Sequence, residues 1–200
     1  MNYESLKSRL ITHCCVPMTV WPLRILIIIF CSSFMLPAHA LDTVSVKRDV
    51  AGLKLGTYLE YLEDKSGEIT IDDLIADDQQ TYSWKKSMQD TPGFGFTTTP
   101  YWFIVDLKNA DTVQNNLLLE IGTSVLDKIE TYYVSNGTVT NVFQAGDHFP
   151  FYDREIPHRN FLIPLSLSPS ENIQVYIRVE TTTSLQLPLS LWSEELFYFE

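Results

Sequence analysis

Residues 91–109 read TPGFGFTTTPYWFIVDLKN, and the rest of the chain is organised around them. The first half is rich in Gly and Pro, which is typical of turns. The second half, residues 101–107, is aromatic and β-branched, a composition that suits a half-buried strand. Because side chains alternate along a strand, one face would be wholly apolar and the other would carry Trp102, Ile104 and Asp106. The stretch predicts a central sandwich strand, with Trp102 either packed within the fold or lining a ligand surface.

The same alternation recurs along the chain between turn residues, and Asn136-Gly137 is a strong hairpin signal. A short helix is expected from Ile71 to Ala76, with Thr70 as its cap. Many short strands without a long helix predict an all-β fold, a two-sheet, jelly-roll-like β-sandwich. The expected strands span residues 53–62, 81–85, 101–107, 115–121, 127–134, 138–143, 161–167, 173–180 and 185–191.

The first 40 residues have the pattern of an export signal. Basic residues precede an apolar run at residues 25–36, and Ala38-His39-Ala40 supplies a cleavage pattern of small residues. An uncleaved signal anchor is the alternative, although the run is short for a membrane span of about 20 residues. We therefore expect a signal peptide at 1–40, a flexible lead-in at 41–51 and the sandwich domain at 52–196.

Composition narrows the chemistry of the exported part. All three cysteines lie within the first 40 residues, so disulfides and thiolate metal sites are not expected in the remainder. Removing Glu4, Lys7, Arg9 and Arg24 leaves 11 basic and 24 acidic residues, a net charge of −13. Such a surface repels nucleic acid and anionic lipid, and it suits cations, neutral sugars or a basic partner.

Three stretches together resemble a known family. They are the central "YWF…LKN" strand, "GLKLGTYLEYLEDKSGEITIDDL" from Gly52, and "RNFLIPLSL" with "IQVYIRVETTTSLQLPLSLW" near the end. Their order and spacing resemble the second extracellular domain type of bacterial receptors with seven transmembrane helices and diverse intracellular signalling modules (7TMR-DISM). The resemblance covers most of residues 52–192.

The resemblance implies a periplasmic sensor domain with a fold similar to carbohydrate-binding modules. In that family, seven membrane helices and a cytosolic output module follow the domain. The sequence after residue 40 contains neither the membrane helices nor an output module. The chain could therefore be a fragment of a receptor or a separate exported domain. The expected location is the periplasmic or extracellular face of a bacterial membrane.

Carbohydrate-binding modules recognise sugars through aromatic and polar side chains on one sheet face, and the sequence offers such a face. On the strand at 173–180, one face carries a phenol, a guanidinium and a carboxylate, a combination suited to ring stacking and hydrogen bonding. An ordinary solvent face, with Arg178 paired to Glu180 or Asp106, is the alternative. The candidate ligand-binding residues are Trp102, Asp106, Tyr176, Arg178, Trp192 and Arg159.

Metal and catalytic motifs are weak in this sequence. His148 and His158 lie in an aperiodic segment with Asp147 and Asp153, but their spacing matches no familiar ligand pattern. The acidic residues Asp72, Asp73 and Asp77 are weak calcium candidates, because they lack the spacing of a calcium loop. Without a nucleophile elbow, a zincin motif or a phosphate loop, an enzyme is not expected.

The sequence therefore predicts an exported sensor domain that binds a carbohydrate or other small polar molecule, without a cofactor. It would signal through a membrane receptor core in cis or in trans, and a homodimer is a further partner that the sequence allows. The alternative is a periplasmic protein-interaction or calcium-responsive module that senses no small molecule.

Overall fold

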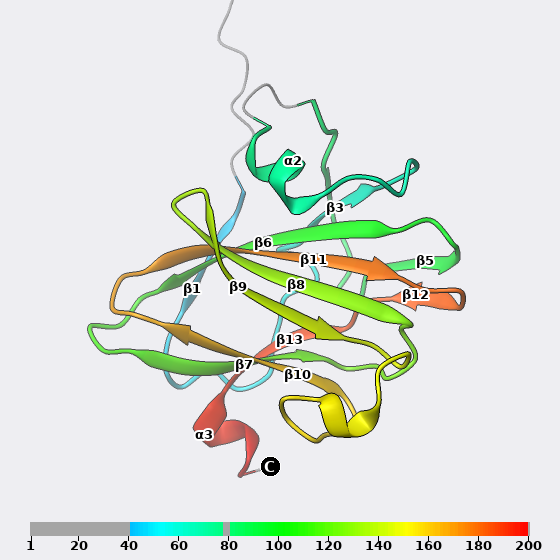
Figure 1. Cartoon of the computed structure of the whole chain (residues 1–200). Coiled ribbons are helices and arrows are strands. Elements are labelled where there is room, and N and C mark those ends of the chain that lie inside the picture. Colours follow the sequence, from blue (N-terminus) through cyan, green and yellow to red (C-terminus); the bar gives the residue numbers. More distant parts are fainter. Residues whose placement is uncertain (1–40, 78–80, 200) are drawn as a thin grey trace, which may run out of the picture. The chain divides into compact units, whose positions relative to one another are not determined.

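A computed structural model describes residues 41–77 and 81–199 of the chain, so the expected signal peptide at 1–40 lies outside the described residues. The central strand is β6 (Tyr101–Asn109), as the sequence predicts, and it lies in a seven-stranded sheet. A four-stranded sheet faces it, and the two layers can be followed in Figure 1. The expected all-β, two-sheet sandwich is confirmed.

The seven-stranded sheet has the order β4-β3-β6-β11-β8-β9, with β1 parallel to β6 on the same edge as β3. The four-stranded sheet has the order β10-β7-β13-β2, and β12 pairs with β5 in a small third sheet. The remaining strands are β1 (Thr43–Val46), β2 (Leu53–Lys54), β3 (Glu60–Glu63), β4 (Lys85–Lys86), β5 (Gly93–Phe96), β7 (Asn115–Ile121), β8 (Lys128–Ser135), β9 (Thr138–Ala145), β10 (Phe161–Leu167), β11 (Asn172–Glu180), β12 (Ser184–Gln186) and β13 (Leu189–Ser193).

The main core lies between the two large sheets and follows from period-two alternation. Every second residue of β6 points inward and is buried, and the same holds for β7, β10 and β11. The hairpin between β8 and β9 turns at Asn136 and Gly137, both with positive φ, as the Asn-Gly pair predicts. Packed apolar faces of this kind supply most of the stability of a sandwich.

A second apolar cluster covers the outer face of the seven-stranded sheet. Helix α2 (Ile71–Ile75) lies over this face in Figure 1, and its Leu74 is buried against it. The capping box expected at Thr70 is present, because Thr70 and Asp73 exchange hydrogen bonds. We call α2 and the apolar side chains around it, at residues 69–75 and 82–84, the cap. Because of the cap, this sheet has apolar side chains packed on both faces.

Five predicted segments differ from the structure. Of the strand expected at 81–85, only Lys85 lies in a strand, the two-residue β4, and residues 81–84 do not. In place of the flexible lead-in at 41–51, the chain forms β1, which buries Val44 and Val46. The single strands expected at 53–62 and 185–191 are each divided, because the chain crosses between sheets near Gly56 and near Pro188. The Gly-rich turn before β6 contains strand β5.

Two short helices complete the structure. A single-turn 3-10 helix, η2 (Phe151–Asp153), lies in the aperiodic loop between β9 and β10. The four-residue helix α3 (Glu194–Phe197) follows β13 and lies against β7 and β13. Among the described residues, no helix combines the length and apolarity that a membrane span requires.

Candidate functional site

The sheet face predicted to bind ligand carries Trp102 and Tyr176, and both are buried. Trp102 is 1% exposed and Tyr176 is 6% exposed beneath the cap. Trp102 packs at 5.8 Å from the ring of Tyr132, and Tyr176 packs at 6.2 Å from Trp84. Burial raises the pKa of Tyr176 to about 12. A ligand therefore cannot reach either ring in this structure, because the cap occupies the face.

The charged residues of the same face are held by protein partners. Arg178 pairs with Glu180, lies 3.4 Å from Glu130, and donates to the backbone carbonyl of Gly67 at 3.2 Å. Its guanidinium also lies 5.9 Å from the centre of the Trp102 ring. This matches the Arg178–Glu180 ion pair that the sequence left as an alternative.

Asp106 and the two remaining candidates lie apart from Arg178. Asp106 accepts a hydrogen bond from the Thr43 hydroxyl at 2.5 Å, which joins β1 to β6. Trp192 lies on the outer face of the other sheet, where its indole N–H donates to Glu120 at 2.8 Å. Arg159 is exposed in the loop between β9 and β10. The structure therefore does not bring the six predicted residues together.

A polar groove lies beside α3. It has a volume of about 350 Å³. Three segments far apart in the sequence form it: the loop after β1, the start of β7, and the end of β13 with α3. Its walls combine amide, carboxylate, guanidinium, hydroxyl and phenol groups. They belong to Arg48, Gln114, Asn115, Asn116, Ser193, Glu194, Glu195 and Tyr198.

The floor of the groove is fixed by buried amides. Asn109, which is 1% exposed, donates to the carbonyl oxygens of Val113, Leu167 and Ser168 at 2.8–3.0 Å. The side-chain oxygen of Asn109 accepts a hydrogen bond from the Nδ2 of Asn115 at 2.8 Å. Because these partners come from several loops, the hydrogen bonds hold this end of the sandwich in one arrangement.

Asp111 joins this floor to the loop after β1. It accepts the backbone N–H of Arg48 at 2.7 Å and the Nδ2 of Asn115 at 3.1 Å. These two hydrogen bonds lower the pKa of Asp111 below its ordinary value. Asp111 is therefore ionised at neutral pH and sets the position of Arg48.

A second, shallower lobe continues the groove past Arg48 and Glu195. Lys47, Asp49, Asp111 and Leu196 complete its lining. Neither lobe could be predicted from the sequence, because the lining residues belong to loops, to β7, to the end of β13 and to α3, a helix that the sequence pattern does not predict. Only the convergence of three distant segments creates the groove.

Among the described residues, one group of side chains could hold a metal ion. Asp127, Asp147 and His148 each offer a ligand atom, and these atoms lie within 4.8 Å of one another. The sequence offers Asp147 and His148 as possible metal ligands. Asp127 lies on a different segment and joins them only in the folded chain. Asp127 already accepts hydrogen bonds from the backbone N–H and the hydroxyl of Thr182, at 2.7 and 2.8 Å.

These contacts predict a pH effect at Asp127. Burial raises its pKa, but the hydrogen bonds from Thr182 and the nearby His148 outweigh burial, so the pKa lies below its ordinary value. A depressed folded-state pKa stabilises the fold above the unfolded value of about 3.9, and the stabilisation is lost as pH falls through the folded value. We expect Asp127→Asn to cost about 1–2 kcal/mol at neutral pH and less at low pH. Urea unfolding of both proteins across pH measures this, and a difference that stays constant with pH would contradict it.

The calcium candidates have structural roles in the cap. Asp73 accepts hydrogen bonds from Thr70 in the capping box, and Asp77 accepts the backbone N–H groups of Thr81 and Tyr82. These hydrogen bonds lower the pKa of both carboxyl groups. The hydrogen bonds give Asp73 and Asp77 a structural role, and calcium binding at Asp72, Asp73 and Asp77 stays a prediction.

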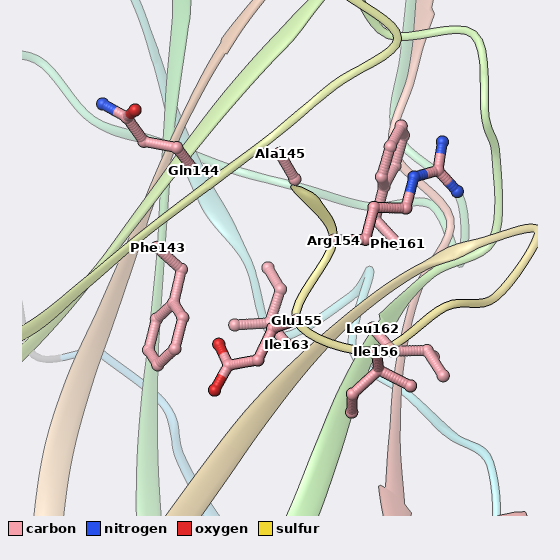
Figure 2. A pocket seen from close by; sticks show the side chains of 9 residues that line it. All are labelled: Phe143, Gln144, Ala145, Arg154, Glu155, Ile156, Phe161, Leu162 and Ile163. Atoms are coloured by element: carbon pink, nitrogen blue, oxygen red, sulfur yellow. The ribbon is translucent and has the colours of Figure 1, made fainter. Parts of the chain in front are cut away.

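The loop between β9 and β10 covers a small apolar pocket, shown in Figure 2. Phe143, Ile156 and Ile163 are among its lining residues, and its volume of about 30 Å³ is close to that of a single water. The Arg154 guanidinium lies 4.6 Å from the centre of the Phe161 ring and donates to the carbonyl of His158 at 2.6 Å. The pocket is too small for an organic ligand. The side chains that line it pack the loop against the sheet.

Comparison with known proteins gives a family and a distant structural likeness. None of the curated proteins matches the chain. The solved structure of TmCBM61 in complex with β-1,4-galactotriose is similar at 10% identity with a TM-score of 0.32, over 71% of this chain and 97% of that one. A likeness this distant carries no argument about what this chain binds. The family model described as 7TMR-DISM extracellular 2 matches residues 56–193, so the chain belongs to the 7TMR-DISM extracellular 2 family, whose domains have an extracellular sensor role.

Proposed function

We propose that this extracellular sensor domain binds a small polar molecule, of the size of a sugar, in the groove beside α3. The groove itself is the observation that carries the proposal. Its volume of about 350 Å³ falls within the range of about 300–1,000 Å³ that is common for small-molecule sites. Its side chains offer both donors and acceptors, as recognition of a polyhydroxylated ligand requires. The proposed role is recognition without catalysis.

The position of the groove suggests how binding would be transmitted. α3 forms one wall of the groove, and it is a single turn without a side-chain cap or a buried residue. Short, weakly held elements of this kind shift between positions at low cost. A ligand that contacts both α3 and the rigid floor would favour one position of α3, which biases an associated membrane receptor by a population shift.

Ligand-induced thermal stabilisation tests the proposal. Glucose, galactose and glucosamine serve as probes, with two groove variants, Asn116→Ala and Tyr198→Ala. A ligand at 100 times its Kd adds about 2.7 kcal/mol of stability to a protein that binds it. We expect a probe to raise the melting temperature of the native protein and to have little effect on the two variants.

The control is Tyr152→Ala, because Tyr152 is 94% exposed and lies outside the groove, in the loop between β9 and β10. This variant should respond to the probes as the native protein does. If both groove variants kept the full response, the groove would not be the ligand site.

A protein-interaction module is the second candidate function. The observation that favours it is a set of exposed aromatic side chains, Phe151, Tyr152, Tyr198 and Phe199. Exposed aromatic residues are enriched at protein interfaces. If no probe stabilised the protein and Tyr152→Ala weakened binding to a receptor core, this candidate would replace the groove.

A further inference from the structure

We propose that the ligand of the groove carries a protonated amine together with hydroxyl groups, as an amino sugar does. This inference rests on the proposed function, since it specifies the chemistry of the same site. Two independent features support it: the orientation of a buried amide in the floor, and the balance of charge along both lobes.

The first feature is the side chain of Asn115. Its Nδ2 donates to Asn109 at 2.8 Å and to Asp111 at 3.1 Å, and these two acceptors fix which end of the amide is nitrogen. The Oδ1 must then face away from them, and it has no hydrogen-bond partner among the described residues although Asn115 is 1% exposed. A buried acceptor without a partner is costly, and Asn115 lines the groove, so a ligand donor that reached the floor would satisfy this oxygen.

The second feature is an excess of carboxylates. The two lobes together present two cations, Lys47 and Arg48, and four carboxylates, Asp49, Asp111, Glu194 and Glu195. Among the described residues of this set, one ion pair forms, between Arg48 and Glu195 at 3.8 Å, and both side chains are largely exposed. Glu194 makes no ion pair within residues 41–77 and 81–199.

These two features favour the same kind of ligand. An orphan acceptor and surplus carboxylates both require N–H or O–H donors, and an ammonium group supplies three donors and a positive charge. A carboxylate or phosphate ligand would place like charges together. Residues 41–200 as a whole, with a net charge of −13, also attract cations to their surface.

Four sugars that share one ring separate the chemical possibilities. Glucosamine carries an ammonium, glucose a hydroxyl, N-acetylglucosamine a neutral amide, and glucuronate a carboxylate. Isothermal titration at about pH 6 keeps the amine protonated and the protein carboxylates charged. We expect glucosamine to bind about tenfold more tightly than glucose, the factor expected from one or two partly exposed ion pairs, and glucuronate to bind most weakly.

Isosteric variants test the role of charge. In the double variant Glu194→Gln with Glu195→Gln, the preference for glucosamine over glucose should fall close to one. Glu68→Gln is the matched control, because Glu68 is an exposed carboxylate outside the groove. The control should keep the tenfold preference.

The outcomes distinguish this inference from the proposed function. Equal affinities for glucose and glucosamine, both lost in Asn116→Ala, would overturn the amine while the groove stands. A preference for glucosamine that survives in the double variant would also overturn it. Failure of all four sugars to bind, or binding that Asn116→Ala does not weaken, would overturn the proposed function as well.

Discussion

Trp102→Ala is expected to lower the free energy of unfolding by about 3–5 kcal/mol, the usual cost of removing a large aromatic side chain from a packed interior. Trp102 is 1% exposed and lies between β6 and the cap, against the ring of Tyr132 and under the guanidinium of Arg178. Truncation removes these contacts and leaves a cavity beneath α2. Urea unfolding of the native protein and the variant measures the change.

A surface aromatic provides the control for this measurement. Tyr152 is 94% exposed, so Tyr152→Ala should change stability by less than about 0.5 kcal/mol. A Trp102→Ala protein that kept native stability but lost ligand binding would contradict the buried position of Trp102. It would instead support the open ligand face that the sequence suggested.

Asn109→Ala is expected to cost about 2–3 kcal/mol, because it leaves buried polar groups without partners. Its Nδ2 lies within 3.0 Å of three backbone carbonyl oxygens, and its Oδ1 accepts the backbone N–H of Asp111 and the Nδ2 of Asn115. Urea unfolding again measures the loss. The variant should also weaken probe binding, since Asn109 holds the floor of the groove.

The nearly isosteric Asn109→Asp separates hydrogen bonding from packing. It keeps the shape of the side chain but replaces the donor with an oxygen that faces three carbonyl groups. It should destabilise the protein at least as much as the alanine variant at neutral pH. Native stability in the aspartate variant would mean that the donated hydrogen bonds contribute little.

Strands whose inward faces are long and regular could be predicted from the sequence. The ranges 115–121 and 161–167 match β7 and β10, because apolar residues occupy every second position and turn residues bound both ends. The Asn136-Gly137 turn was predictable for a local reason, since both residues must adopt positive φ. The family was predictable because the order of these segments carries information that no single motif has.

Other parts of the fold depend on contacts between distant segments. The strand expected at 53–62 is divided where the chain crosses from one sheet to the other. Gly56 lies at this crossing, so close to the backbone of Asp90 that a side chain would clash, and local sequence does not reveal this contact. The four-residue strand β1 gains its order from pairing with β6, and nothing local in residues 41–51 predicts that pairing. Alternation alone shows which residues share a face, but not what covers that face.

The same limit explains the site. A strand face with Trp102 and Tyr176 has the same alternating pattern whether solvent, ligand or a helix lies against it, and here the cap lies against it. The groove could not be predicted because the segments that line it, near residues 48, 115 and 195, are far apart in the sequence. Only the order of the strands in the sheets and the position of α3 bring them together. The candidate residues came from the faces of single strands and from one loop, so they do not include a groove that is built where three distant segments meet.

The most direct test of the groove is a titration of the isotope-labelled protein with glucosamine, followed by amide chemical shifts in NMR spectra. The groove predicts that the largest shifts fall within residues 47–49, 111–116 and 193–198, while residues 102–106 and 176–180 beneath the cap stay unchanged. Shifts confined to the strands beneath the cap, or no shifts at saturating glucosamine, would contradict a ligand site beside α3.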